Sequence, residues 1–193
     1  ERPQVDPLTA ADVAEDVVIR DSLPVTLEEC IEVYGLRCFK VKISGDPEHD
    51  LKRLEQIWEI IPRANEPIIT LDANEAYEDL DAFEKMVNQL ESSNLALFQH
   101  ISFIEQPLPR KLALSESVKD VIGRIAQKKP VIIDESDDSL DAFRRAQAVG
   151  YTGTSHKNCK GVYKSVARRA QLHKMAEMGR DTAFSGEDLQ NLP

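Results

Sequence analysis

The sequence has few cysteines and no long apolar run, and these absences exclude several classes of protein. Its three cysteines, Cys30, Cys38 and Cys159, are odd in number and have no metal-ligand spacing, so they predict neither a disulfide framework nor a zinc site. We expect them to be reduced thiols in a cytoplasmic protein. No apolar run approaches the roughly 18 residues that a membrane-spanning helix needs, so a membrane is not an expected partner.

Positive charge is also in short supply. The 193 residues include 24 Lys and Arg against 34 Asp and Glu, which gives a net charge of -10 at pH 7. This balance argues against nucleic acid or an anionic membrane surface as the main partner. Hydrophobic residues make up 41% of the chain and charged residues 30%, which is ordinary for one globular domain or part of one.

The most informative stretch is residues 38–45, whose β-branched and aromatic residues and final glycine predict a short strand. Because strand side chains alternate between faces, Lys40 and Lys42 must point the same way, opposite to Phe39 and Val41. The apolar face needs a core, so the two lysines face either a cavity or water.

Two ammonium groups one pleat apart repel each other, and a like charge lowers the pKa of a neighbouring lysine. In a partly closed cavity, one of these lysines could act as a base near neutral pH. The alternative is an exposed edge strand whose lysines are simply solvated.

Strands and helices alternate along the rest of the chain. Six strands are predicted, at residues 38–45, 67–72, 101–105, 130–134, 152–157 and 182–185. Six helices are predicted, at residues 26–34, 49–61, 80–90, 115–126, 140–149 and 162–178. This rhythm, without a Gly-rich phosphate loop after the first strand, fits a (β/α)8 barrel of the TIM type better than a dinucleotide-binding sheet.

A (β/α)8 barrel typically needs about 250 residues, so we expect this chain to supply only strands two to seven of one. Residues 26–193 would form this partial barrel, as a piece of a longer protein. Residues 1–25 are rich in Asp, Pro and small polar residues, with Val17-Val18-Ile19 as their apolar run. We expect them to be an irregular, mobile segment.

Charged residues end the four strands that follow the lysine strand: Asp72, Glu105, Asp134 and Lys157. Barrel active sites lie at the carboxyl ends of the strands, so these side chains should converge at one mouth. Each carboxylate taken alone could instead be the N-cap of the next helix. Three converging carboxylates would repel unless a divalent cation lay among them, and this number of oxygen ligands favours Mg²⁺.

Five motifs in this order resemble those of the enolase superfamily, most closely its mandelate racemase and muconate lactonizing branch. The resemblance runs from about Thr26 to Asp188. The motifs are Lys40-Val41-Lys42, Asp72-Ala73-Asn74, Glu105-Gln106-Pro107, Asp134-Glu135-Ser136, and Lys157 within Ser155-His156-Lys157-Asn158-Cys159-Lys160-Gly161.

The resemblance implies a homo-oligomeric enzyme that removes the proton alpha to the carboxylate of a small-molecule substrate. Asp72, Glu105 and Asp134 would bind Mg²⁺, which would stabilise the enediolate. Asn74 and Glu135 would hold these ligands in place.

The resemblance also gives the lysines roles. Lys42 and Lys157 would be the two acid/base residues, and Lys40 would tune Lys42 and contact the substrate carboxylate. If the lysine strand is the second of eight, the Lys157 strand is the sixth, and strands four apart lie across the barrel. That arrangement suits racemisation, epimerisation, cycloisomerisation, or dehydration with one lysine.

The chain departs from the family in places. The mandelate racemase subgroup has a His on its seventh strand, where this chain has Ser185-Gly186-Glu187-Asp188, so the pattern points to the muconate-type subgroup. The capping domain and the first and eighth strands are not in this sequence, so we do not expect this segment alone to be active.

Two other interpretations remain open. One is a Schiff-base aldolase barrel that uses Lys42 or Lys157 as a nucleophile. The other is a non-catalytic barrel that retains the motifs.

Some polar residues are expected to play no catalytic part. His156 should face away from the mouth and serve in packing or on the surface. Lys160 and Cys159 lie near the mouth but receive no role. Four arginines are expected to be solvated on helix surfaces: Arg144, Arg145, Arg168 and Arg169.

Overall fold

The computed structural model describes residues 7–13 and 23–186. Six parallel strands form one sheet, and their order across the sheet follows their order in the chain. The strands are β1 (Cys38–Lys42), β2 (Ile68–Asp72), β3 (Ile101–Glu105), β4 (Val131–Ile133), β5 (Gly153–His156) and β6 (Ala183–Gly186).

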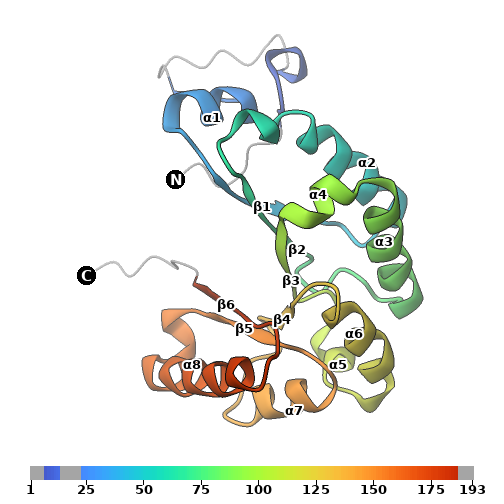
Figure 1. Ribbon diagram of the computed structural model, residues 1–193, viewed down its shortest axis with the longest axis vertical. Helices are drawn as coiled ribbons and strands as arrows, with labels where there is room; N and C mark the ends of the chain where they lie inside the picture. Colours follow the sequence, from blue (N-terminus) through green and yellow to red (C-terminus); the bar gives the residue numbers. More distant parts are fainter. Residues whose placement is uncertain (1–6, 14–22, 187–193) are drawn as a thin grey trace.

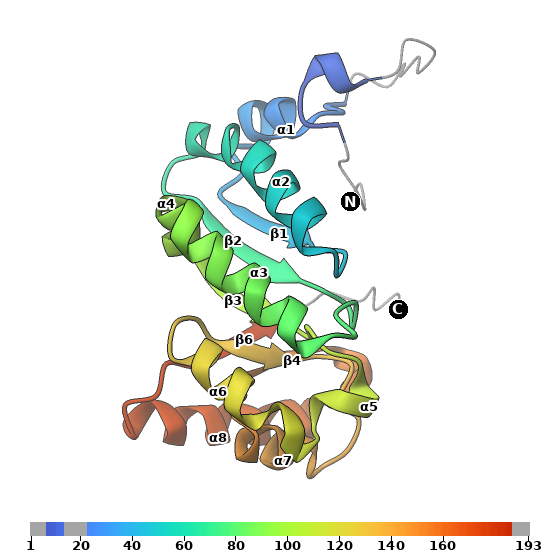
Figure 2. The ribbon, with the colours of Figure 1, turned by 90° about the vertical axis from the view of Figure 1, so that its right-hand side faces the viewer.

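Helices connect the strands and lie along the outer side of the curled sheet, as Figures 1 and 2 show from two directions. The α-helices are α1 (Leu27–Tyr34), α2 (Pro47–Trp58), α3 (Leu80–Ser93), α4 (Leu95–His100), α5 (Arg110–Ala113), α6 (Lys119–Ala126), α7 (Ala142–Ala148) and α8 (Val162–Glu177). The 3-10 turns are η1 (Ala10–Asp12), η2 (Ile61–Arg63), η3 (Glu116–Val118) and η4 (Asn158–Lys160).

This arrangement is an incomplete (β/α)8 barrel, as the sequence predicted. Every predicted strand and helix of residues 26–186 is present, with ends shifted by a few residues. The short helices α4 and α5 were missed. No helix in the described ranges is both long and apolar enough to cross a membrane.

Local patterns explain why the elements form where they do. Thr26 caps α1 through a capping box with Glu29, and Gly35 ends the helix at φ 60°, in the left-handed region that glycine tolerates. On α3, Phe83, Val87 and Leu90 repeat at helical spacing, and all three side chains are buried in the hydrophobic core.

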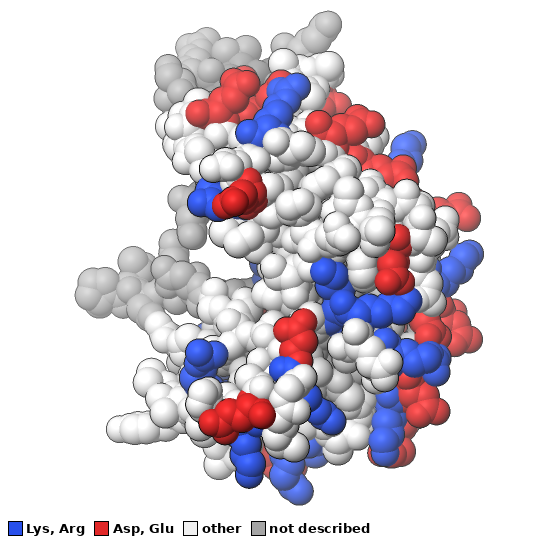
Figure 3. All heavy atoms as spheres, viewed as in Figure 1, with Lys and Arg blue, Asp and Glu red and all other residues white. Residues whose placement is uncertain are grey.

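The outer face carries charges of both signs. Figure 3 shows Lys and Arg interspersed with Asp and Glu over α3 and α6. There Arg124 lies 2.7 Å from Glu84, and Lys128 lies 2.5 Å from Glu91. Such solvent-exposed pairs contribute about 0–1 kcal/mol each, so the apolar core rather than this face holds the fold together.

The described part of residues 1–25 contacts the first helix. It includes the 3-10 turn η1, and the backbone oxygens of Pro7 and Leu8 accept hydrogen bonds of 3.0 and 3.1 Å from Leu27 and Glu28 at the start of α1. Leu8 is buried. The apolar run 17–19 lies outside the described residues.

One expectation about the surface is wrong. Arg168 on α8 is 2% exposed rather than solvated, and its Nη2 atom lies 2.9 Å from Oδ1 of Asp137. The interacting carboxylate is 31 residues earlier in the chain, beyond the reach of a local helix pattern.

Candidate active site

The predicted lysines and carboxylates meet at the carboxyl edge of the sheet. Lys42, the last residue of β1, pairs in register with Asp72 of β2, and Asp72 pairs with Glu105 of β3. Neighbouring parallel strands lie about 4.8 Å apart, so these three residues form a row along the edge. Asp134 follows β4 directly, and Lys157 follows β5.

The alternation predicted for β1 is confirmed. Phe39 and Val41 are buried, whereas Lys40 and Lys42 are on the open face. β1 is an edge strand of the described sheet, as the alternative interpretation held. Its lysines are not simply solvated, however, because both form ion pairs with carboxylates that are almost fully buried.

Lys40 joins two carboxylates. Its Nζ atom lies 2.9 Å from Oδ2 of Asp72 and 2.9 Å from Oε2 of Glu105. Burial disfavours the ammonium ion, but the hydrogen bond to Asp72 and the charge of Glu105 outweigh burial and raise the pKa of Lys40. The prediction that lysine–lysine repulsion lowers a pKa here is therefore wrong for Lys40.

Lys42 contacts the same oxygen of Asp72 as Lys40 does. Its Nζ atom lies 2.5 Å from Oδ2 of Asp72 and also donates a hydrogen bond to Oδ1 of Asn74. Burial would raise the pKa of Asp72, but the hydrogen bonds from Lys42 and Lys40 outweigh burial and lower it. The Lys42 side chain is 55% exposed, so small molecules in solution can reach it.

Asn74 and Glu135 lie where they can support the carboxylates. The backbone N–H of Asn74 donates to Oδ1 of Asp72 at 3.0 Å, and its side-chain amide donates to Oε1 of Glu135 at 3.0 Å. The pair therefore links the loop after β2 to the segment after β4.

Glu105 has an unsatisfied oxygen. Its side chain is 0% exposed, and Oε1 has no hydrogen-bond partner among the described residues. Burial and the nearby charge of Asp72 raise the pKa of Glu105, although Lys40 opposes this shift. A buried carboxylate with an unpaired oxygen beside a second carboxylate is a donor set that fits a hard divalent cation.

Two lysine side chains form ion pairs with Asp134. Lys157 Nζ lies 2.5 Å from Oδ2 of Asp134, and Lys160 Nζ lies 2.6 Å from Oδ1, which also accepts a hydrogen bond from Ser155. Burial would raise the pKa of Asp134, but hydrogen bonds from Lys157, Lys160 and Ser155 outweigh it and lower the pKa to about 2.

The structure does not bring all three predicted ligands into one group. Within residues 7–13 and 23–186, no three His, Cys, Asp or Glu side chains are placed to hold one metal ion. Asp72 and Glu105 share Lys40, whereas Asp134 is bound by Lys157 and Lys160. The joint Mg²⁺ site therefore stays a prediction.

Comparison with protein-family models identifies the family of this chain. Residues 24–179 match the family model described as enolase C-terminal domain-like. The chain belongs to this family.

Relatives of this enolase-like chain include enzymes. It is 34% identical to the L-Lys-D/L-Arg epimerase of Methylococcus capsulatus over 88 residues, which are 44% of this chain and 22% of that protein. A mandelate racemase/muconate lactonizing protein from Herpetosiphon aurantiacus superposes with a TM-score of 0.59 at 24% identity, covering 83% of this chain and 42% of that chain.

The muconate lactonizing enzyme from Pseudomonas putida superposes with a TM-score of 0.57 at 24% identity, covering 81% of this chain and 40% of that chain. At these identities the two structures show the fold alone. The chain spans less than half the length of each of these three relatives.

The sequence interpretation of this enolase-like domain missed Gln106, which is 0% exposed. Its Oε1 atom accepts hydrogen bonds from the backbone N–H groups of Asp134 at 2.8 Å and Ser136 at 3.1 Å.

Gln106 has φ 36°, and Asn74 and Glu75 also have positive φ, at 43° and 71°. Non-glycine residues seldom adopt such angles, and they cluster at functional sites.

His156 takes the packing role that was expected of it in this enolase-like domain. Its Nδ1 atom is hydrogen-bonded to the hydroxyl of Ser165 on α8, and its ring lies 6.3 Å from that of Phe184. Lys160, which was given no role, contacts Asp134 directly.

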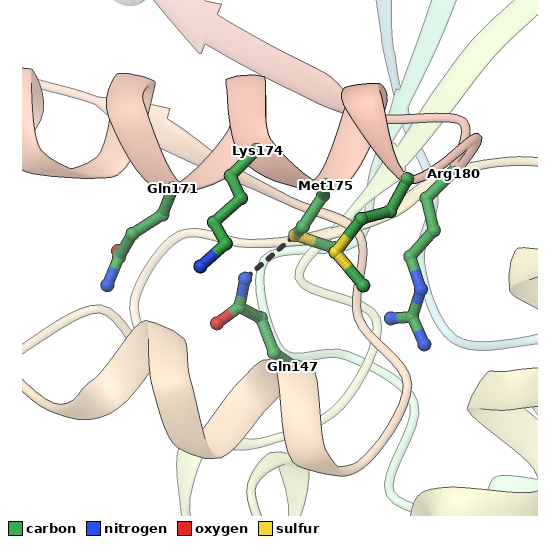
Figure 4. A pocket seen from close by; sticks show the side chains of 6 residues that line it. Gln147, Gln171, Lys174, Met175 and Arg180 are labelled. Carbon is green, nitrogen blue, oxygen red and sulfur yellow. Dashed lines mark hydrogen bonds between the residues drawn. The ribbon is translucent and has the colours of Figure 1, made fainter.

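A cavity of about 320 Å³ lies away from this edge, between α7 and α8 (Figure 4). Because these helices run back toward the amino ends of the strands, their last turns lie opposite the carboxyl edge of the sheet. None of the predicted site residues lines the cavity, which is formed by Gln147, Gln171, Lys174, Met175, Met178 and Arg180.

Proposed function

We propose that this enolase-like domain is part of a Mg²⁺-dependent isomerase or lyase that removes the proton alpha to a carboxylate group. One observation carries the proposal: two lysines, Lys42 and Lys157, each lie 2.5 Å from a different strand-end carboxylate, Asp72 and Asp134. The family and its epimerase relative support the same chemistry.

Lys42 and Lys157 would exchange protons with the substrate. Both end or follow strands on the same edge of the sheet, four strands apart in its order. A lysine acts as a base only after it has given up a proton, so each must first leave its ion pair. Lys40 would bind the substrate carboxylate, and its positive charge would tune the acid/base behaviour of Lys42.

Asp72, Glu105 and Asp134 would hold the Mg²⁺ ion. The unpaired oxygen and raised pKa of Glu105 support this assignment, because a cation would compensate the buried charge. When bound, Mg²⁺ would supply the positive charge that stabilises an enediolate. Asn74 and Glu135 would keep Asp72 in place through their hydrogen bonds.

The substrate would be a small carboxylate. The epimerase relative is named for Lys- and Arg-containing substrates, so dipeptides are the first candidates. The complete protein would work as a homo-oligomer in the cytoplasm. Cys30, Cys38 and Cys159 are not joined by a disulfide in the described residues, which is consistent with a reducing compartment.

Proton exchange in deuterated water tests the proposed function. The natural full-length protein is incubated with Mg²⁺ and a set of dipeptides that includes L-Lys-L-Arg, and loss of the alpha-proton signal is followed by NMR. We expect exchange with at least one carboxylate, its loss after chelation of the metal, and its loss in Asp72→Asn. Asp79→Asn, at an exposed N-cap of the following helix, is the control and should retain exchange.

Other results would favour the other interpretations. Exchange that persists without divalent metal would contradict the proposal. Inactivation by borohydride in the presence of a carbonyl substrate would favour a Schiff-base aldolase. Mg²⁺ binding without exchange from any carboxylate would favour a non-catalytic barrel.

A further inference from the structure

Three cations on one side of η4 and α8 reach the segment that follows β4. Lys164 and Arg168 are four residues apart on α8, so they lie on one helical face, and Lys160 precedes them at the end of η4. Lys160 donates to the backbone oxygen of Asp134 at 2.6 Å, Lys164 to that of Asp137 at 2.5 Å, and Arg168 to that of Ser139 at 2.9 Å. The first of these contacts is at the candidate site.

The ammonium group of Lys160 donates hydrogen bonds to three acceptors. Besides the backbone oxygen of Asp134, it donates to Oδ1 of the same residue at 2.6 Å and to the hydroxyl oxygen of Ser155 at 2.8 Å. A lysine ammonium has three protons, and each has an acceptor here. The Ser155 hydroxyl in turn donates to Oδ1 of Asp134, so the contacts form a closed ring. Lys160 is 13% exposed.

The two lysines near Asp134 therefore act on different oxygens. Lys157 lies 2.5 Å from Oδ2, whereas Lys160 and Ser155 hold Oδ1. If Lys157 leaves to exchange a proton, Oδ1 keeps both of its hydrogen bonds. Lys160 also contacts the backbone of Asp134, so it fixes the side chain relative to the main chain.

We propose that Lys160 is a positioning residue, which holds Oδ1 of the Asp134 carboxylate and leaves Oδ2 for Lys157 or for a cation. The link to a cation rests on the proposed function. Two effects on Mg²⁺ binding oppose each other. The charge of Lys160 repels a nearby cation, whereas its hydrogen bonds prepare the ligand. A charge with three satisfied hydrogen bonds is partly neutralised by its own acceptors, so the second effect should dominate.

Mg²⁺ titration calorimetry on the full-length protein without substrate tests whether the supporting hydrogen bonds of Lys160 outweigh the repulsion by its charge. Lys160→Ala should raise the Kd for Mg²⁺ by about 10–100-fold, the usual effect of removing a group that supports a ligand. Lys160→Arg should recover most of the affinity, because a guanidinium can still donate to the backbone oxygen and to Oδ1 of Asp134. Lys174→Ala, which removes an exposed lysine of α8, should bind like the wild type. Where Asp134→Asn weakens Mg²⁺ binding, an unchanged or tighter Kd in Lys160→Ala overturns the proposal.

Two further variants separate this proposal from the proposed function. Lys160→Met keeps the aliphatic stem, and its circular dichroism melt shows whether it folds. Unchanged Mg²⁺ binding in Asp134→Asn would remove Asp134 from the proposed metal site. The positioning role is then decided by a crystal structure of metal-free Lys160→Met. A carboxylate that has rotated away from Ser155 supports the role, and one that has stayed in place overturns it.

Discussion

Arg168 on α8 donates from Nη2 to Oδ1 of Asp137 at 2.9 Å, and the two side chains are 3% and 1% exposed. Thr154 donates to the other oxygen of Asp137 at 3.1 Å, and the guanidinium also donates to the backbone oxygens of Ser139 and Leu140. This cluster ties the segment after β4, which begins at Asp134, to the last long helix.

Arg168→Ala should therefore lower the free energy of unfolding by about 3–5 kcal/mol, the usual loss when one member of a buried ion pair is removed. Urea denaturation of the full-length protein measures the change. Arg169→Ala, its exposed neighbour, should stay within about 0.5 kcal/mol of the wild type. Equal losses in both variants would mean that the buried pair does not stabilise the fold.

Gly45, in the loop that follows the lysine strand, is predicted to tolerate no side chain. Its φ is 90°, and a Cβ atom there would lie 2.4 Å from the backbone oxygen of Ala76. Gly45→Ala should lower the free energy of unfolding by at least about 1–2 kcal/mol, the usual penalty for a left-handed alanine, plus the effect of the clash.

Gly123→Ala is the matched control, because Gly123 lies within α6 and a Cβ atom there meets nothing within 4 Å. Alanine has the higher helix propensity, so this variant should be more stable by about 0.4–1 kcal/mol. Thermal denaturation of both variants gives the comparison. A Gly45→Ala variant as stable as Gly123→Ala would contradict the close approach of the two loops.

Stability at high pH should depend on Tyr77. Its hydroxyl donates to Oδ2 of Asp50 at 2.6 Å, and burial together with this carboxylate raises the pKa of Tyr77. In the unfolded chain tyrosine ionises near pH 10, so above this pH the unfolded state loses a proton that the folded state keeps. The free energy of unfolding should then fall by up to about 1.4 kcal/mol per pH unit for this group.

Urea denaturation between about pH 9 and pH 11, one unit either side of the tyrosine pKa, measures this slope. Tyr77→Phe should reduce it, although buried Tyr151, whose pKa burial also raises, will leave a remainder. Tyr163→Phe is the control, because Tyr163 is 93% exposed. The same slope in the wild type and Tyr77→Phe would show that Tyr77 ionises normally in the folded protein.

The features that the sequence predicted correctly are local ones. β-Branched runs located the strands, and the stripe of Phe83, Val87 and Leu90 located α3, because burial repeats with the period of each element. The carboxylates and Lys157 could be placed at one edge because parallel strands share a direction.

Contacts between distant segments were not predictable in this way. Lys160 meets Asp134 over 26 residues, and Arg168 meets Asp137 over 31 residues. The raised pKa of Lys40 was not foreseen, because the sequence interpretation considered only the neighbouring lysine along the strand. The carboxylates on the next two strands act on it more strongly.

If Lys42 and Lys157 are the two acid/base residues, they should act on opposite faces of one substrate carbon, because their strands are four apart and lie across an eight-stranded barrel. Stereospecific alpha-proton exchange by the full-length protein in deuterated water tests this claim most directly, once a substrate is in hand. Lys42→Ala should stop exchange from one enantiomer and Lys157→Ala from the other, each by about 10²–10⁴-fold. Lys174→Ala should leave both rates unchanged. Exchange from both enantiomers that survives in Lys157→Ala would contradict the two-base account.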